Sequence, residues 1–240
     1  MSVSAQDRSA RIEEHPLDNA VWAALTGPFH ARFAEINGQA ARYQTDVAPF
    51  TTLATGADEH AWAQLAELVG PGAEVSVVAP DGVALPPGWT VATALPGVQL
   101  IDAGIEAVPD EEAVRLGPAD VPEMLDLVAR TRPGPFLPRT IELGTYLGIR
   151  RDGALIAMAG ERLHPPGWTE ISAVCTDAAY RGQGLGTRLV KAVAAGIRDR
   201  GETPFMHAAA SNTNAIRLYT SLGFQLRRRP SFSLIRVPGR

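Results

Sequence analysis

The fold of this chain is decided by the stretch Arg181-Gly182-Gln183-Gly184-Leu185-Gly186-Thr187. It lies between a run of strand-forming residues at 170–176 and an amphipathic segment at 185–200. Three glycines in five positions let a backbone turn tightly and approach a ligand closely. The helix expected after them offers free backbone amides and the positive end of its dipole. Together with the charge of Arg181, the stretch predicts a turn that binds pyrophosphate.

Two familiar nucleotide-binding loops do not fit this turn. A Walker loop ends in Gly-Lys-Ser/Thr, and the pair Gly186-Thr187 lacks the lysine. A dinucleotide fingerprint needs glycine where Thr187 stands and an acidic residue ending the next strand, whereas Asp199 lies inside the expected helix. Short glycine motifs also occur in turns that merely join a strand to a helix, so that interpretation stays open on this stretch alone.

Alternating strands and helices are expected around the turn. A hairpin turn is expected at Asp152-Gly153, and a helix is expected to end at Gly201. A further helix is capped by Ser211 or Asn212 and ended by Gly223. The expected strands are 113–116, 146–150, 154–164, 170–176, 204–210 and two around Pro230, and the expected helices are 118–130, 185–200 and 212–222.

The first 110 residues carry no recognisable chemical motif. Residues 1–14 are polar and indicate a mobile tail. Helical spacing is expected over 17–36, with an interruption at Gly27-Pro28, and again over 61–69. Short strands are expected at 74–79 and 90–95. We therefore expect an α+β domain over 15–110, followed by a second domain over 111–240.

Charge is unevenly distributed between the two halves. The net charge is −4, yet residues 1–110 hold 4 Lys+Arg against 14 Asp+Glu, and residues 111–240 hold 18 against 12. This asymmetry predicts an anionic partner for the second half, such as a nucleotide with several phosphates. The basic residues are scattered and not interleaved with aromatic ones, so nucleic acid is not expected as a partner.

Taken with its surroundings, the turn resembles motif A of the GCN5-related N-acetyltransferases, whose pattern is Gln/Arg-x-x-Gly-x-Gly/Ala. About thirty residues later, the segments Asn212–Tyr219 and Leu222–Phe224 resemble that family's Asn-x-x-Ala-x-x-Leu-Tyr-x-x-x-Gly-Phe motif. The resemblance covers about residues 113–240, and more narrowly it points to the branch related to glycine N-acyltransferases. It implies a mixed α/β fold with a central sheet flanked by helices. In that branch a smaller N-terminal half is often a degenerate copy of the same fold.

The resemblance also implies acetyl-CoA as cosubstrate and an amine as acceptor. Its pantetheine arm would lie along the strand before the turn, and its pyrophosphate over the turn itself. The cofactor-binding residues so implied are Val174, Cys175, Thr176, Arg181, Gly182, Gln183, Gly184, Leu185, Gly186, Thr187 and Asn212. For Asn212, a plain helix cap is an equally open role.

One residue is expected to act as acid, and three are candidates for the base. By resemblance, Tyr219 matches the general acid that protonates the leaving thiolate, although a core tyrosine is an alternative. His207 stands five residues before Asn212, where related ribosomal-protein alanine acetyltransferases carry a glutamate base, and neutral histidine is a competent base. Glu170 is the rival base, and Glu161 is a third choice.

The cysteine content and the lack of expected signal or membrane segments narrow the class of protein. The single cysteine, Cys175, allows no internal disulfide, and no Cys/His spacing suggests a metal site. With no signal peptide and no membrane span expected, the prediction is a cytoplasmic protein. The function predicted is transfer of acetyl to a primary amine of a small molecule, amino acid or peptide. Transfer of a longer acyl group, a non-catalytic acyl-CoA-binding role and a homodimer joined by the N-terminal half stay open.

Overall fold

The computed structural model describes residues 15–78 and 85–239, and a mixed β-sheet runs through its centre. The tail predicted at 1–14 lies outside the described residues. Within them the strand order is β1-β2-β3-β4-β12-β5-β10-β9-β8-β7-β6, and β11 pairs with β5. The strands are β1 (Ala34–Asn37), β2 (Ala40–Tyr43), β3 (Phe50–Leu53), β4 (Glu74–Val77), β5 (Thr90–Asp102), β6 (Val114–Arg115), β7 (Tyr146–Arg151), β8 (Ala154–Glu161), β9 (Trp168–Thr176), β10 (Thr203–Ala209), β11 (Phe224–Arg228) and β12 (Ser231–Arg236).

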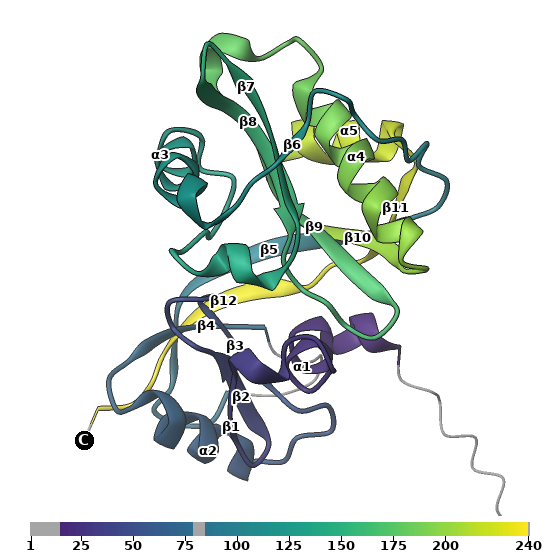
Figure 1. The fold of residues 1–240 in the computed structure, drawn as a ribbon. Coiled ribbons are helices and arrows are strands. Elements are labelled where there is room, and N and C mark those ends of the chain that lie inside the picture. The colour runs from purple at the N-terminus through teal and green to yellow at the C-terminus, as the bar shows by residue number, and fades with distance from the viewer. Residues whose placement is uncertain (1–14, 79–84, 240) are drawn as a thin grey trace, which may run out of the picture.

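The long strand β5 joins the two halves of the chain. It pairs antiparallel with β10, β11 and β12, and β12 in turn pairs with β4 (Figure 1). The last strand of the chain therefore completes the sheet of the N-terminal half. The domain boundary expected near residue 110 stays a prediction, but β5 lies before that boundary and all three of its partners lie after it.

Helices cover both faces of the C-terminal strands. The apolar stripe of α4, which includes Leu189 and Val193, packs with Ile156, Ile171 and other residues of the sheet, whereas α3 packs on the opposite face against Met158 (Figure 1). This arrangement confirms the predicted fold class, a central mixed sheet flanked by helices. The α-helices are α1 (Ala20–Leu25), α2 (His60–Val69), α3 (Val121–Thr131), α4 (Leu185–Asp199) and α5 (Thr213–Ser221), and the 3₁₀ helices are η1 (Pro16–Asn19), η2 (Ala31–Phe33), η3 (Pro118–Asp120), η4 (Thr140–Leu143) and η5 (Ala178–Tyr180).

The structure confirms the predicted hairpin turn, the predicted cap of one helix and the predicted end of another. Asp152 and Gly153 have φ angles of 49° and 83° and form the predicted hairpin turn between β7 and β8. Asn212 caps α5, because its side-chain oxygen accepts from the Ala215 amide at 3.2 Å. Gly201, with φ 77°, follows the end of α4 as expected.

The N-terminal half corrects three expectations. Residues 34–37 form β1 and not the end of a helix, and helical structure in 17–36 is limited to η1, α1 and η2. Strands β2 and β3 were missed because all but one of their eight residues are buried, which removes the alternation that marks a half-exposed strand. The strand expected at 90–95 continues to Asp102, since its second half is buried between β10, β11 and the N-terminal residues.

The parallel strands β9 and β10 separate part-way along their length. Their register pairs Trp168 with Thr203, Thr169 with Pro204 and Glu170 with Phe205. Beyond that point Ala173 adopts φ 52°, and the pairing of β9 with β8 shifts register between Met158 and Gly160. Such a bulge bends a strand away from its neighbour.

Within residues 15–78 and 85–239, every helix is too short or too polar to cross a membrane.

Candidate active site

A cleft of about 470 Å³ opens where β9 and β10 diverge. The diverging strands form two of its walls, and residues of α5, of the end of α3 and of other segments, among them Leu95, Arg162 and Arg181, complete the lining. Its lining includes Val174, Cys175, Thr176, Arg181, His207, Asn212 and Tyr219, all of them residues predicted for the site. Arg181 of the first motif and Asn212 and Tyr219 of the second therefore line one cavity.

The glycine turn leads into α4 beside this cleft. Gly182 and Gly184 have φ angles of 78° and 74°, a backbone region that favours glycine. Gly184 is the N-cap of α4 and supplies no side-chain cap. In the part of the chain that the structure describes, no backbone amide from Gly182 to Thr187 donates to another protein group. Such unpaired donors at the start of a 15-residue helix are the kind of group that favours an anion.

Two arginines add positive charge to the cleft. Arg181 and Arg132 both line it, and neither forms a salt bridge with any described residue. Arg181 makes one long hydrogen bond, from Nε to the Thr176 carbonyl at 3.4 Å. Arg132 adopts a left-handed backbone conformation, with φ 52°, at the end of α3. Such uncompensated guanidinium groups suit phosphate oxygens.

Tyr219 and Cys175 both line the cleft. Burial raises the pKa of the Tyr219 hydroxyl to about 12, so this group keeps its proton at neutral pH. Burial also raises the pKa of the Cys175 thiol to about 11. The cysteine is therefore a neutral thiol, which is a poor nucleophile.

His207, Glu170 and Arg162 form a buried network of hydrogen bonds. The Nδ1 of His207 lies 2.8 Å from Oε1 of Glu170. Glu170 also accepts two hydrogen bonds from Arg162, at 2.8 Å from Nε and 2.7 Å from Nη2. Burial opposes ionisation of Glu170, but the pairing with Arg162 and the hydrogen bond with His207 outweigh it and lower its pKa to about 2. Glu170 is therefore a carboxylate that accepts a hydrogen bond from Nδ1–H of His207.

Gln99 fixes the other nitrogen of His207. Arg227 donates to Oε1 of Gln99 at 2.9 Å, which orients the amide so that its Nε2 points away from Arg227. That Nε2 lies 3.1 Å from Nε2 of His207 and also donates to the Leu17 carbonyl at 2.9 Å. The amide nitrogen is a donor, so His207 Nε2 must be the acceptor. The network thus selects a neutral histidine protonated on Nδ1.

This architecture matches a solved structure over nearly its whole length. An acetyltransferase of the GNAT family from Novosphingobium aromaticivorans is 43% identical, with a TM-score of 0.84, and the match covers 92% of this chain and 98% of that one. The chain belongs to the GNAT family. The model of the FR47-like protein family also matches residues 146–233, which hold both motifs.

Curated relatives of this GNAT protein are longer than the part that aligns. An uncharacterised protein of Mycobacterium leprae is 34% identical over 210 residues, which cover 79% of this chain and 56% of that protein. The N-alpha-acetyltransferase RimI of Mycobacterium tuberculosis is 38% identical over 90 residues, 35% of this chain and 56% of that protein. The chain thus spans about half the length of these two relatives.

Among the predicted proton carriers of this GNAT chain, two reach the cleft and two do not. Tyr219 and His207 line it. Glu170 is fully buried beneath His207 and does not line the cleft. Glu161 is also buried, where it accepts from Arg200 at 2.9 Å and from the Thr145 amide at 3.1 Å. The turn residues Gly182–Thr187 lie outside the cleft wall, at the start of α4.

Three site residues were not predicted from the sequence. Arg162 follows the end of β8, Arg132 ends α3, and Gln99 lies in the middle of β5. Each reaches the site through strand pairing or helix packing between distant segments. The available signal for Arg162 was an arginine inside the expected strand 154–164, since a charge that such a strand buries requires a partner.

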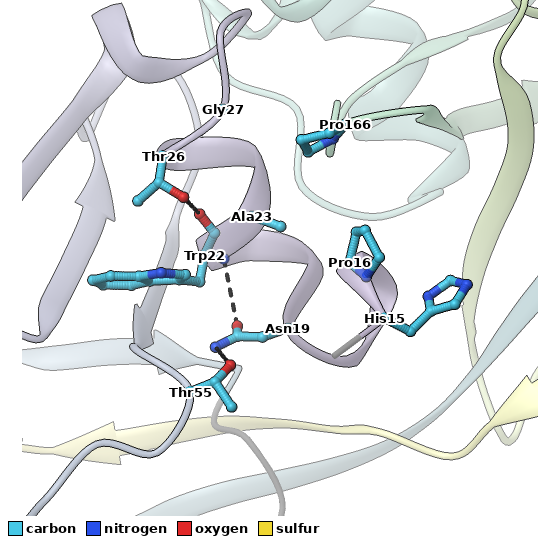
Figure 2. Close-up of a pocket in the computed structure, with 9 residues that line it drawn as sticks. All are labelled: His15, Pro16, Asn19, Trp22, Ala23, Thr26, Gly27, Thr55 and Pro166. Atoms are coloured by element: carbon cyan, nitrogen blue, oxygen red, sulfur yellow. Dashed lines mark hydrogen bonds between the residues drawn. The ribbon is translucent and has the colours of Figure 1, made fainter. Parts of the chain in front are cut away.

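A second cavity, of about 260 Å³, lies beside η1 and α1 (Figure 2). Its polar groups are largely paired with one another. Asn19 accepts from the Trp22 amide at 3.4 Å and donates to Thr55 at 3.4 Å, and Thr26 donates to the Trp22 carbonyl at 2.8 Å. None of the predicted site residues lines this cavity, so we assign it no part in the chemistry.

Proposed function

We propose that this protein is an acetyl-CoA-dependent N-acetyltransferase that moves acetyl directly from the CoA thioester to a primary amine. The observation that carries the proposal is a cleft lined by the guanidinium groups of Arg132 and Arg181, by the protonated hydroxyl of Tyr219 and by His207. The amides of the glycine turn lie at the start of α4, directly after Arg181. The link to the glycine N-acyltransferase-like branch is part of this proposal.

Acetyl-CoA would bind along the diverging edge of β9. The pyrophosphate would accept hydrogen bonds from the amides of residues 182–187, and Arg132 and Arg181 would neutralise phosphate charge. The pantetheine arm would lie between Val174–Thr176 and β10. Asn212 lines the same cleft while it caps α5, so its free amide nitrogen is available to the arm.

The reaction needs one proton removed and one supplied. The amine nitrogen attacks the thioester carbonyl, a C–N bond forms, and the C–S bond breaks. Tyr219 donates its proton to the departing thiolate, for which its hydroxyl is in the required form. The neutral thiol of Cys175 argues for this direct transfer and against a covalent acyl-cysteine.

We propose His207 as the base that takes the proton of the amine. Its Nε2 carries the lone pair and accepts a hydrogen bond from Gln99, so the amine would have to displace the Gln99 amide to reach it. Glu170 would then act as a positioning residue, because it fixes the ring and stabilises the imidazolium that forms. The analogous arrangement of carboxylate, histidine and reacting group is well known in hydrolases. As a direct base Glu170 is disfavoured, since both its oxygens are committed and it does not reach the cleft.

The proposal is tested by calorimetry and by release of free CoA thiol. Purified protein should bind acetyl-CoA and gain thermal stability in its presence, because a ligand of the folded state shifts the unfolding equilibrium. A panel of amines should then include one that releases CoA in proportion to N-acetylated product. No acetyl-CoA binding at millimolar concentration contradicts the proposal, and binding without transfer to any amine favours a non-catalytic role. If transfer from a longer acyl-CoA is faster than transfer from acetyl-CoA, the longer acyl-CoA is the preferred donor.

A further inference from the structure

A smaller cavity adjoins the cleft on the side of the N-terminal half. Its volume is about 200 Å³, and it shares Arg162, His207 and residues 208–209 of β10 with the cleft. It extends away from them toward β3 and β4, where Phe50 and Ser76 line it. A molecule in this cavity would approach His207 from the side opposite the glycine turn.

Two aromatic rings, one from the N-terminal half and one from the last strand, line it. Phe50 of β3 lies against the Arg162 guanidinium, whose carbon is 4.9 Å from the ring centre. Phe232 of β12 meets the His207 ring edge-on, with centres 5.3 Å apart. Phe232 packs over Gly97, where a Cβ would stand only 2.5 Å from its Cε2. Both rings are therefore held in place by contacts that the acetyl-transfer motifs do not include.

The charge of this cavity limits what it can take. Among the described residues that line it there is no Asp or Glu, and Arg162 is its single permanent charge. A second ammonium group on the acceptor would find no carboxylate there and would lose its hydration. An apolar group would lose no favourable hydration on entering the cavity, and it would cover the rings of Phe50 and Phe232. About 150 Å³ is enough for a benzene ring in an apolar cavity.

We propose that this cavity binds the carbon skeleton of the acceptor, and that the acceptor is a monoamine with an apolar substituent about the size of an aromatic ring. The inference rests on the proposed function and adds the class of substrate. It also gives the N-terminal half a role, because β3 and β4 supply the wall that selects the substituent. Polyamines and other acceptors with several cationic groups would be disfavoured.

The first test compares acceptors on the wild-type protein. Acetyl transfer to phenethylamine, to ethanolamine and to 1,4-diaminobutane is followed as release of CoA thiol. Burial of the phenyl group should raise kcat/KM for phenethylamine about 10- to 100-fold above that of either other amine. A kcat/KM for 1,4-diaminobutane equal to or above that for phenethylamine overturns the inference while acetyl transfer itself stands.

The second test fills the cavity. Ser76→Leu should raise KM for phenethylamine about tenfold or more and leave the Kd of acetyl-CoA unchanged, because Ser76 lines the smaller cavity and not the cleft. Phe50→Ala should raise the same KM by removing one wall. Phe29→Ala is the matched control, since that ring is 48% exposed and lines neither cavity. Unchanged KM values in both cavity variants overturn the inference, and failure of the wild type to bind acetyl-CoA overturns the proposed function as well.

Discussion

His207 and Glu170 lie on the two parallel strands of the sheet that separate, at the level where the separation begins. Glu170 is the last residue of β9 in register with β10, opposite Phe205, and His207 stands two residues further along β10. Their side chains meet at 2.8 Å, and neither is more than 6% exposed. A buried charged carboxylate therefore supports a histidine at the edge of the cleft, which links the stability of the sheet to the chemistry proposed for the site.

Removing the charge of Glu170 should destabilise the fold. Glu170→Gln leaves the buried Arg162 without its counter-ion, and loss of one partner of such a pair costs about 3–5 kcal/mol. Denaturant unfolding at pH 7 measures the change. Glu106→Gln is the control, because Glu106 pairs with Lys191 on the surface at 2.7 Å and its loss should have little effect.

The same variant should alter the acid limb of the stability profile. The pKa of Glu170 falls from 4.5 to about 2 in the folded protein, so its stabilising contribution is complete above about pH 4.5 and is lost as the pH falls toward 2. Wild-type protein should lose free energy of unfolding across that window, and Glu170→Gln should lose less. Parallel curves for the two proteins between pH 4.5 and 2 would contradict this assignment.

The rate profile should identify the base. If Nε2 of His207 takes the proton of the amine, His207→Ala should lower kcat by about 10²–10⁴-fold and remove the acid limb of kcat/KM against pH. His60→Ala is the control, since His60 is exposed and remote from the cleft. An acid limb that persists in His207→Ala but is lost in Glu170→Gln would transfer the role of base to Glu170.

The sequence predicted those parts of the site that are local in the chain. The glycine turn, the cap at Asn212 and the position of Tyr219 depend on neighbouring residues, so short motifs carry them. Gln99 and His207 meet because β5 and β10 pair in one register, and Phe232 reaches His207 through the pairing of β12 with β5. Such registers are set by burial of whole strands, which no short motif encodes. Long-range pairing also explains why β5 was predicted too short.

Gly184 should be required for cofactor binding and not for folding alone. On the proposed binding mode Gly184→Ala places a methyl group where the phosphates would approach, and it should raise the Kd of acetyl-CoA about tenfold or more. Gly167→Ala is a matched control, because Gly167 has φ 77° against 74° for Gly184 and both have open space around a Cβ. Each variant should lose about 1–2 kcal/mol from backbone strain. Equal loss of acetyl-CoA affinity in both would mean that strain, and not blocked approach, weakens binding.

Tyr219→Phe isolates the step in which the thiolate leaves. The substitution removes one oxygen atom from a ring that packs with Phe224 and the helix α4 core, so folding should be little affected. If the hydroxyl protonates the thiolate, kcat should fall about 10²–10⁴-fold while the Kd of acetyl-CoA stays within about twofold. Tyr180→Phe supplies the control, because Tyr180 packs against the same core without lining the cleft. Full activity in Tyr219→Phe would mean that water or the acceptor protonates the thiolate, and Tyr219 would then be a packing residue of α5.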